Sequence, residues 1–175
     1  LRLATTAHEP IPVPTAFARR VDLETIVGRD GARQTQATIA LANAGRQFIT
    51  VNLPADAKLL SARVAGEAVK VERVGQSGWR LAVPRDRQAV AVQVLWAQGP
   101  ADGLDGLDLG GIELPGVEIN AARWRVYPPA GWRVGSYETD LRAEWETQPD
   151  PAITVVHASR QLARSATDAV AGYEE

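Results

Sequence analysis

The sequence has no cysteine and only two histidines, His8 and His157, among its 175 residues. The absence of cysteine excludes disulfide bonds, thiolate nucleophiles and cysteine-ligated zinc. The two histidines lie far apart in the chain, and no H-E-x-x-H motif is present. We therefore expect both histidines to be ordinary surface or interface residues.

The sequence also lacks a long apolar run and an excess of charge of either sign. No apolar run approaches the ~20 residues that a membrane-spanning helix needs. The net charge of −2 provides no basic field for nucleic acid or an anionic membrane. No phosphate-binding loop or dinucleotide fingerprint occurs, and Ser77 lies in G-Q-S-G, which is not a nucleophile elbow. These absences predict a protein without a cofactor, without catalytic residues and without a nucleic-acid partner.

What is present is a hydrophobic content of 45% with 23% charged residues, which is typical of a globular domain. The clearest pattern lies in residues 58–96, which we interpret as four short strands joined by three turns. In its last strand Val90, Val92, Val94 and Trp96 occupy every second position. A period of two predicts a strand with one buried face.

The same alternation recurs through the first two thirds of the chain, where turn residues separate short strands. Asp30-Gly31 follows a strand at 19–27, and Ala65-Gly66-Glu67 predicts a further hairpin. Turns recur about every 8–12 residues, which predicts a mainly β fold, an antiparallel sandwich of seven to nine strands. Immunoglobulin-like, fibronectin-like and jelly-roll-like arrangements remain open. In the earlier strands one face is predicted to carry Thr35, Ala37, Ile39 and Leu41, and the inward residues of the next strand are Ile49, Val51 and Leu53. The hairpin at 65–67 is preceded by Leu60, Ala62 and Val64.

We divide the chain into three segments. Residues 1–18 contain three prolines spaced by two and are expected to be an extended linker or edge. Residues 19–134 form the predicted sandwich domain. Residues 135–175 are expected to be a connector with a short C-terminal helix at 159–172. Because the sequence begins at Leu1 and contains no methionine, we expect it to be a processed product or an excised domain.

A loop rich in glycine and aspartate follows the valine strand. Asp102, Asp105 and Asp108 are spaced by three, and carboxylates of this kind supply the oxygen ligands that Ca²⁺ prefers. Their spacing is not that of an EF-hand, and leucines alternate with them at Leu104, Leu107 and Leu109. We therefore favour a structural loop held to the core by its leucines, and keep a metal site at the three aspartates as the alternative.

The five tryptophans are the candidate binding residues of this sequence. Trp96 and Trp124 fall at inward positions of predicted strands, so we assign them to the core. Trp132 follows Pro128-Pro129-Ala130-Gly131 on a predicted turn, and Trp145 lies between two glutamates. Exposed aromatic side chains at these two positions are candidates for binding a sugar or a protein, although packing over an end of the sandwich is the more common role.

Two sequence patterns follow one another within residues 20–134. The first pattern consists of Leu60, Val64, Gly66, Val69, Trp79, Leu81, Pro84, Val90, Val92 and Trp96. The second consists of Leu114, Pro115, Arg123, Trp124, Val126, Tyr127, Pro129, Gly131 and Trp132. Together they resemble β-rich extracytoplasmic modules in large bacterial envelope proteins. The resemblance implies a fold and a periplasmic or extracytoplasmic location, but it assigns no functional residues.

Taken together, the sequence predicts a non-enzymatic structural or interaction module of a larger bacterial envelope protein. Its partner would be another protein or a neighbouring domain of the same polypeptide. One alternative is a carbohydrate-binding module that uses Trp132 or Trp145, and another is the accessory domain of an enzyme whose catalytic part lies outside this chain. A pair of carboxylates about 5–9 Å apart across a groove is the one catalytic arrangement that the composition leaves open.

Overall fold

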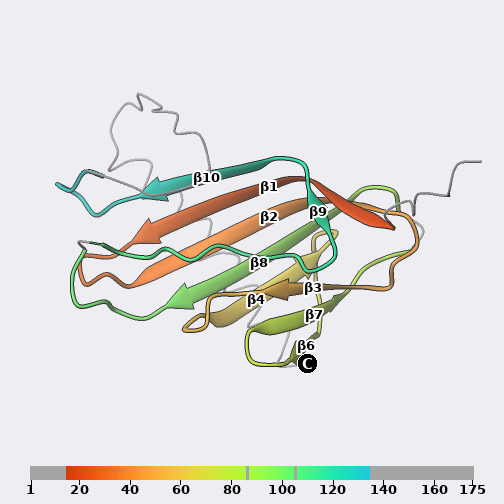
Figure 1. The fold of residues 1–175 in the computed structure, drawn as a ribbon, viewed down its shortest axis with the longest axis horizontal. Helices are drawn as coiled ribbons and strands as arrows, with labels where there is room; N and C mark the ends of the chain where they lie inside the picture. Colours follow the sequence, from red (N-terminus) through yellow and green to blue (C-terminus); the bar gives the residue numbers. More distant parts are fainter. Residues whose placement is uncertain (1–14, 86, 105, 135–175) are drawn as a thin grey trace, which may run out of the picture.

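The computed structural model describes residues 15–85, 87–104 and 106–134, and these residues form a mainly β fold of two sheets (Figure 1). No helix occurs within these ranges, and the helix predicted at 159–172 lies outside them. The prediction of a mainly β sandwich is confirmed. The ten strands are β1 (Ala16–Val27), β2 (Arg33–Asn43), β3 (Phe48–Asn52), β4 (Lys58–Val64), β5 (Glu67–Ala68), β6 (Val71–Val74), β7 (Gly78–Ala82), β8 (Val90–Gln98), β9 (Glu118–Ile119) and β10 (Ala122–Tyr127).

The strands are shared between a large sheet, in the order β10-β1-β2-β8-β4-β5 with β9 beside β1, and a small sheet, in the order β3-β7-β6. Most neighbouring strands are antiparallel, as predicted, but β9 and β10 both run parallel to β1. The stretch 58–96 does not form one meander, because β4 and β8 belong to the large sheet and β6 and β7 to the small one.

The core lies between the two sheets and follows the period of two. Val90, Val92, Val94 and Trp96 of β8 are each no more than 3% exposed, which confirms the predicted register. The inward side chains predicted for β2 and β3 are buried beside them. Burying one such aliphatic side chain contributes about 1.5–3 kcal/mol, so the alternation along β2 and β8 is the main source of stability.

Two β-bulges interrupt the alternation. In β1 the register shifts between Ala18 and Arg20, so the buried positions change from even to odd numbers and Arg19 and Arg20 are both exposed. In β4 the shift lies between Leu59 and Ser61. Leu60 is therefore 38% exposed, and Leu59 packs against the core instead.

The hairpin predicted at residues 65–67 is confirmed as a two-residue turn between β4 and β5. Val64 pairs with Glu67, and the two residues between them have positive φ angles, 54° at Ala65 and 87° at Gly66. This left-handed conformation is natural for Gly66 and strained for Ala65, because a Cβ atom crowds the following carbonyl oxygen.

The segment between β8 and β9 closes one side of the sandwich. Ile112, Leu114 and Val117 are buried in the core, and Glu113 pairs with Asn52 of β3 through its backbone. The three alternating leucines of the preceding loop are half-buried, in line with the favoured role of that loop. A side chain at Gly110 would place its Cβ only 2.6 Å from the ring of Pro54, so only glycine fits where this segment passes Pro54. After this segment the chain continues into β9 and β10, which pair with β1 at the edge of the large sheet.

Candidate functional site: a polar hollow on the large sheet

The outer face of the large sheet carries a hollow of about 370 Å³ that lies on the side away from the core. The described residues that line it are all charged or carry an amide or hydroxyl group, and none of them is aromatic. They come from four neighbouring strands, and they occupy the outward positions opposite the buried ones. They are Arg20, Asp22 and Glu24 of β1, Gln36 and Thr38 of β2, Gln93 of β8, and Arg123 and Arg125 of β10.

The charged wall of the hollow is built by the parallel pairing of β1 with β10. Asp22 lies opposite Arg123 in the register, and Glu24 lies opposite Arg125. Arg125 Nη1 donates to Glu24 Oε1 at 3.1 Å, and Arg20 Nε donates to Asp22 Oδ2 at 2.6 Å. Both carboxylates therefore already have a guanidinium partner.

On the opposite side of the sheet, a chain of hydrogen bonds holds β10 in this register. The indole N–H of Trp124 donates to Thr25 Oγ1 at 2.8 Å, and the Thr25 and Thr35 hydroxyls lie 2.8 Å apart. Thr25 and Thr35 are fully buried, and Trp124 is half-buried against the core. Trp96, directly across from Thr35 on β8, is fully buried, as predicted.

Several side chains of the hollow have no partner among the described residues. Arg123 makes no hydrogen bond or ion pair with any described residue, and its side chain is exposed. On the floor, Gln36, Thr38 and Gln93 likewise form no side-chain hydrogen bond within the described ranges. The hollow thus presents one exposed guanidinium and several amide or hydroxyl groups to whatever enters it.

The electrostatics of the hollow favour ionic binding. Its lining holds three arginines and two carboxylates, a net charge of +1, whereas the chain as a whole carries −2. The sequence left open a catalytic carboxylate pair without naming its residues, and Asp22 and Glu24 are the two carboxylates among the described lining of the hollow. However, they sit two residues apart on one strand and each binds an arginine. A glycosidase instead needs two carboxyl groups that flank the scissile bond from either side.

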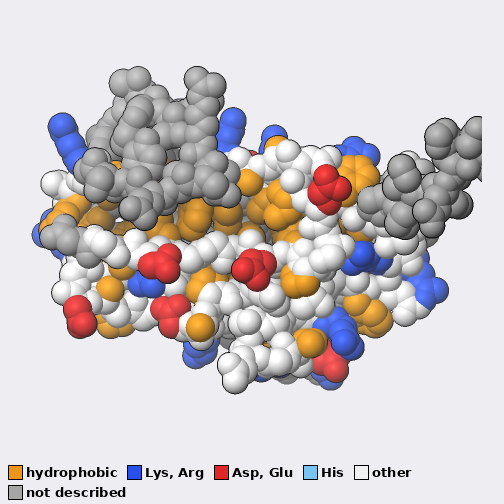
Figure 2. Space-filling view, viewed as in Figure 1, with side chains coloured by type: hydrophobic (Ala, Val, Ile, Leu, Met, Phe, Trp, Pro, Cys, Tyr) orange, Lys and Arg blue, Asp and Glu red, His pale blue; other side chains and the backbone are white. Residues whose placement is uncertain are grey.

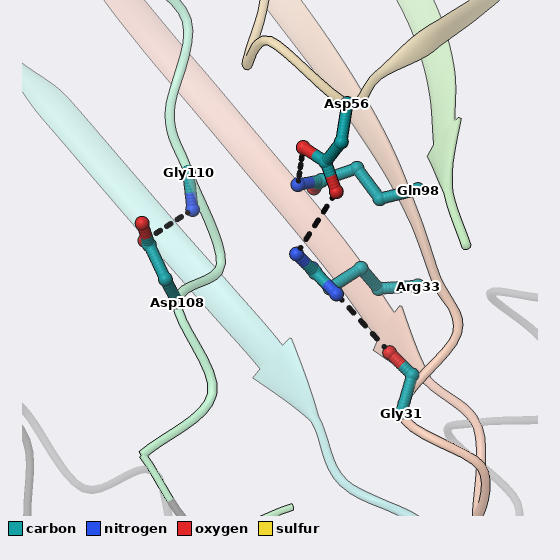
Figure 3. Close-up of polar contacts among 6 residues, drawn as sticks. All are labelled: Gly31, Arg33, Asp56, Gln98, Asp108 and Gly110. Carbon is teal, nitrogen blue, oxygen red and sulfur yellow. Dashed lines mark hydrogen bonds and ion pairs between the residues drawn. The ribbon is translucent and has the colours of Figure 1, made fainter. Parts of the chain in front are cut away.

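Asp102 and Asp108, two of the three aspartates kept as an alternative metal site, are not among the residues that line this hollow. Asp108 Oδ1 accepts a hydrogen bond from the backbone N–H of Gly110 at 2.9 Å (Figure 3). Asp102 is exposed, and Asp105 lies outside the described residues. Within the described part of the chain, no group of three or more His, Cys, Asp or Glu side chains is arranged to hold a metal ion.

A second polar cluster lies at the end of the sandwich and has a structural role. Asp56 accepts from Gln98 Nε2 at 2.9 Å and from Arg33 Nη2 at 3.4 Å (Figure 3). Arg33 Nη1 also donates to the carbonyl oxygen of Gly31 at 3.3 Å. Since Arg33 and Gln98 are buried neighbours on β2 and β8, these contacts fasten the loop between β3 and β4 to the large sheet.

Trp132, one of the two predicted binding tryptophans, is half exposed on a turn after β10. Its side chain is 50% exposed, and its backbone N–H donates to the carbonyl oxygen of Pro129 at 3.0 Å. It does not belong to the described lining of the hollow. Trp145 lies outside the described residues. On the face that Figure 2 shows, apolar and charged side chains are intermixed over the small sheet, unlike the wholly polar lining of the hollow.

The residues of the hollow were not singled out by the sequence, although part of the signal is present. Asp22 and Glu24 alternate with buried residues on β1, and Arg123 and Arg125 stand on either side of the half-buried Trp124 on β10. The sequence alone therefore shows two acidic and two basic residues with the same spacing of two. It does not show their parallel pairing, because this pairing joins segments about a hundred residues apart.

The structure contains no helix, within the described residues, that is long and apolar enough to cross a membrane. No protein-family model matches the sequence, and no curated protein matches it.

Partial structural likeness is found to two peptidases and a hydrolase. An M1 zinc metallopeptidase from Deinococcus radiodurans bound to a Tyr-Ser-Ala substrate has a TM-score of 0.42 and 17% identity, over 54% of this chain and 23% of that one. Aminopeptidase A from Legionella pneumophila in complex with aspartic acid has a TM-score of 0.42 and 10% identity, over 51% and 11%. Native yeast LTA4 hydrolase has a TM-score of 0.39 and 8% identity, over 47% and 14%. The chain therefore spans less than a quarter of each of these proteins.

Proposed function

We propose that this chain is a non-enzymatic accessory module that docks a neighbouring protein domain through the outer face of the large sheet. The observation that carries the proposal is the hollow, with its two arginine–carboxylate pairs and the exposed Arg123. Interfaces between domains of one polypeptide are more polar than those of obligate complexes, and polar side chains around a concave surface fit that class.

The same geometry argues against the two rival functions. Catalysis by paired carboxylates is disfavoured because Asp22 and Glu24 are each bound by an arginine on the same face. Sugar binding is disfavoured at the hollow because no aromatic side chain is among its described lining residues. A sugar ring usually packs one apolar face on an aromatic side chain, and Trp132 stands on a separate turn.

The sequence resemblance to extracytoplasmic modules supports placing this module in a bacterial envelope protein, in the periplasm or outside the cell. In that setting its partner is another domain of the same polypeptide. The accessory-domain alternative, in which that other domain is an enzyme, requires the same docking surface. The two versions therefore share one test.

The test compares two matched substitutions on opposite faces of the sandwich. Thr38→Trp fills the hollow, and Thr50→Trp places the same bulk on the outer face of the small sheet; both threonines are half-buried. The polypeptide that adjoins this chain in its gene product is expressed separately, and its affinity for each variant is measured by calorimetry. We expect Thr38→Trp to abolish binding and Thr50→Trp to leave it unchanged. Equal affinity for both variants would refute the proposed surface.

A further inference from the structure

We infer that the hollow recognises an acidic protein segment, whose carboxylate side chain binds Arg123. This inference rests on the proposed docking function and names the chemistry of the docked partner.

The first argument is the position of Arg123. Its side chain is exposed, and no described residue forms an ion pair or hydrogen bond with it. In the register it lies opposite Asp22, whose carboxylate is already bound to Arg20 at 2.6 Å. The guanidinium of Arg123 is therefore available, and its planar shape matches a carboxylate through two parallel hydrogen bonds.

The second argument is that the other two arginines already have a carboxylate partner. Arg20 and Arg125 contact Asp22 and Glu24, so their guanidinium groups already lie beside the hollow before a partner arrives. A guanidinium has five N–H donors, and a single contact with one carboxylate leaves several of them unused. The two arginines can thus add donors beside Arg123 at a reduced cost in side-chain entropy.

The third argument is the floor of the hollow. Gln36, Thr38 and Gln93 have no side-chain partner in the described structure, and all three line the hollow. An amide carries both donors and an acceptor, and so matches the N–H and C=O groups of a peptide backbone. This combination of a cationic wall and an amide floor fits a short acidic stretch of polypeptide.

The charge count favours a protein carboxylate over nucleic acid. The lining carries a net charge of +1, and its two carboxylates repel closely spaced phosphates. Binding to a nucleic-acid backbone rests on many basic contacts, each of which neutralises one phosphate. The net charge of this hollow can balance one carboxylate, which is the number that the exposed Arg123 can pair with.

The test uses the full chain and a blocked tetraglutamate peptide at low salt. Binding is followed by NMR through the backbone amides and the Nε–H groups of Arg20, Arg123 and Arg125. We expect shifts confined to the hollow, and a roughly threefold to tenfold weaker affinity in Arg123→Gln, the range for one ion pair at a partly exposed site. Arg87→Gln is the control, because Arg87 is exposed on the loop before β8 and does not line the hollow.

Three outcomes would overturn the inference: no shifts in the hollow, equal weakening in Arg87→Gln, or equal binding of tetralysine. Tighter binding of a thymidine oligonucleotide than of the peptide would indicate a nucleic-acid partner and would also overturn the inference of an acidic protein segment. These failures are distinguishable from failure of the docking function. If the adjoining polypeptide still binds and Thr38→Trp still blocks it, the docking surface is supported. Only the inference that the partner is acidic is then refuted.

Discussion

The hydrogen-bonded chain Trp124–Thr25–Thr35 makes the sharpest prediction about stability. Thr25→Val keeps the shape of the side chain but removes the hydroxyl group that joins Trp124 of β10 to Thr35 of β2. Both threonines are fully buried, so the Thr35 hydroxyl loses its partner where water does not reach it. The Trp124 N–H loses its partner as well, although this side chain is only half-buried.

The magnitude follows from these two losses. A net hydrogen bond contributes about 0.5–1.5 kcal/mol, and an orphaned buried polar group costs about 1–3 kcal/mol. Because the indole of Trp124 can still find water, we expect Thr25→Val to lower the free energy of unfolding by about 2–3 kcal/mol. For a chain of this size each kcal/mol corresponds to roughly 2–4 °C in melting temperature.

The assay is urea denaturation followed by far-ultraviolet circular dichroism, on single and double variants. Thr25→Val combined with Thr35→Val removes both hydroxyls, so the double variant should cost at least about 1 kcal/mol less than the sum of the singles. Thr50→Val is the control, because Thr50 is half-buried and has no side-chain hydrogen bond among the described residues. The reasoning is refuted if Thr25→Val stays within about 0.5 kcal/mol of the parent, or if the two substitutions are additive.

Three further predictions concern the turn, the core and the aspartate loop. Ala65→Asn should raise the free energy of unfolding by up to about 1 kcal/mol, since asparagine tolerates the φ of 54° better than alanine; an unchanged or lower urea midpoint would contradict this. Val92→Asp places a charge at a fully buried position and should cost about 4 kcal/mol or more; a variant that melts within a degree of the parent would show the register to be wrong. Calcium should leave the melting temperature unchanged, and a calcium-dependent rise that disappears in Asp105→Ala would establish the metal site that we disfavour.

Local features of the fold were predictable because they depend on neighbours in the sequence. The period of two from Val90 to Trp96 identified both the strand and its buried face, since a strand between a core and solvent needs this alternation. The turn at Ala65-Gly66 was predictable because glycine readily adopts a left-handed conformation.

The features that build the hollow depend on contacts distant in sequence. The parallel pairing of β10 with β1 joins Glu24 to Arg125, and no local pattern encodes which strand a distant segment will join. The bulge in β1 exposes both Arg19 and Arg20, and the bulge in β4 exposes Leu60. A bulge shifts the alternation by one residue without any signature of its own in these strands. The sequence therefore predicted the sandwich core but not the face that we propose as its binding surface.

The most direct test of the docking face is arginine labelling with phenylglyoxal, followed by mass spectrometry. Labelling is measured on this chain alone and on the longer polypeptide to which we propose that it belongs. Arg123 is exposed, as is Arg87, which serves as an internal reference outside the hollow. We predict that both are labelled in the isolated chain, and that Arg123, but not Arg87, becomes protected in the longer polypeptide. Equal labelling of Arg123 in both forms would contradict the proposal that this face docks a neighbouring domain.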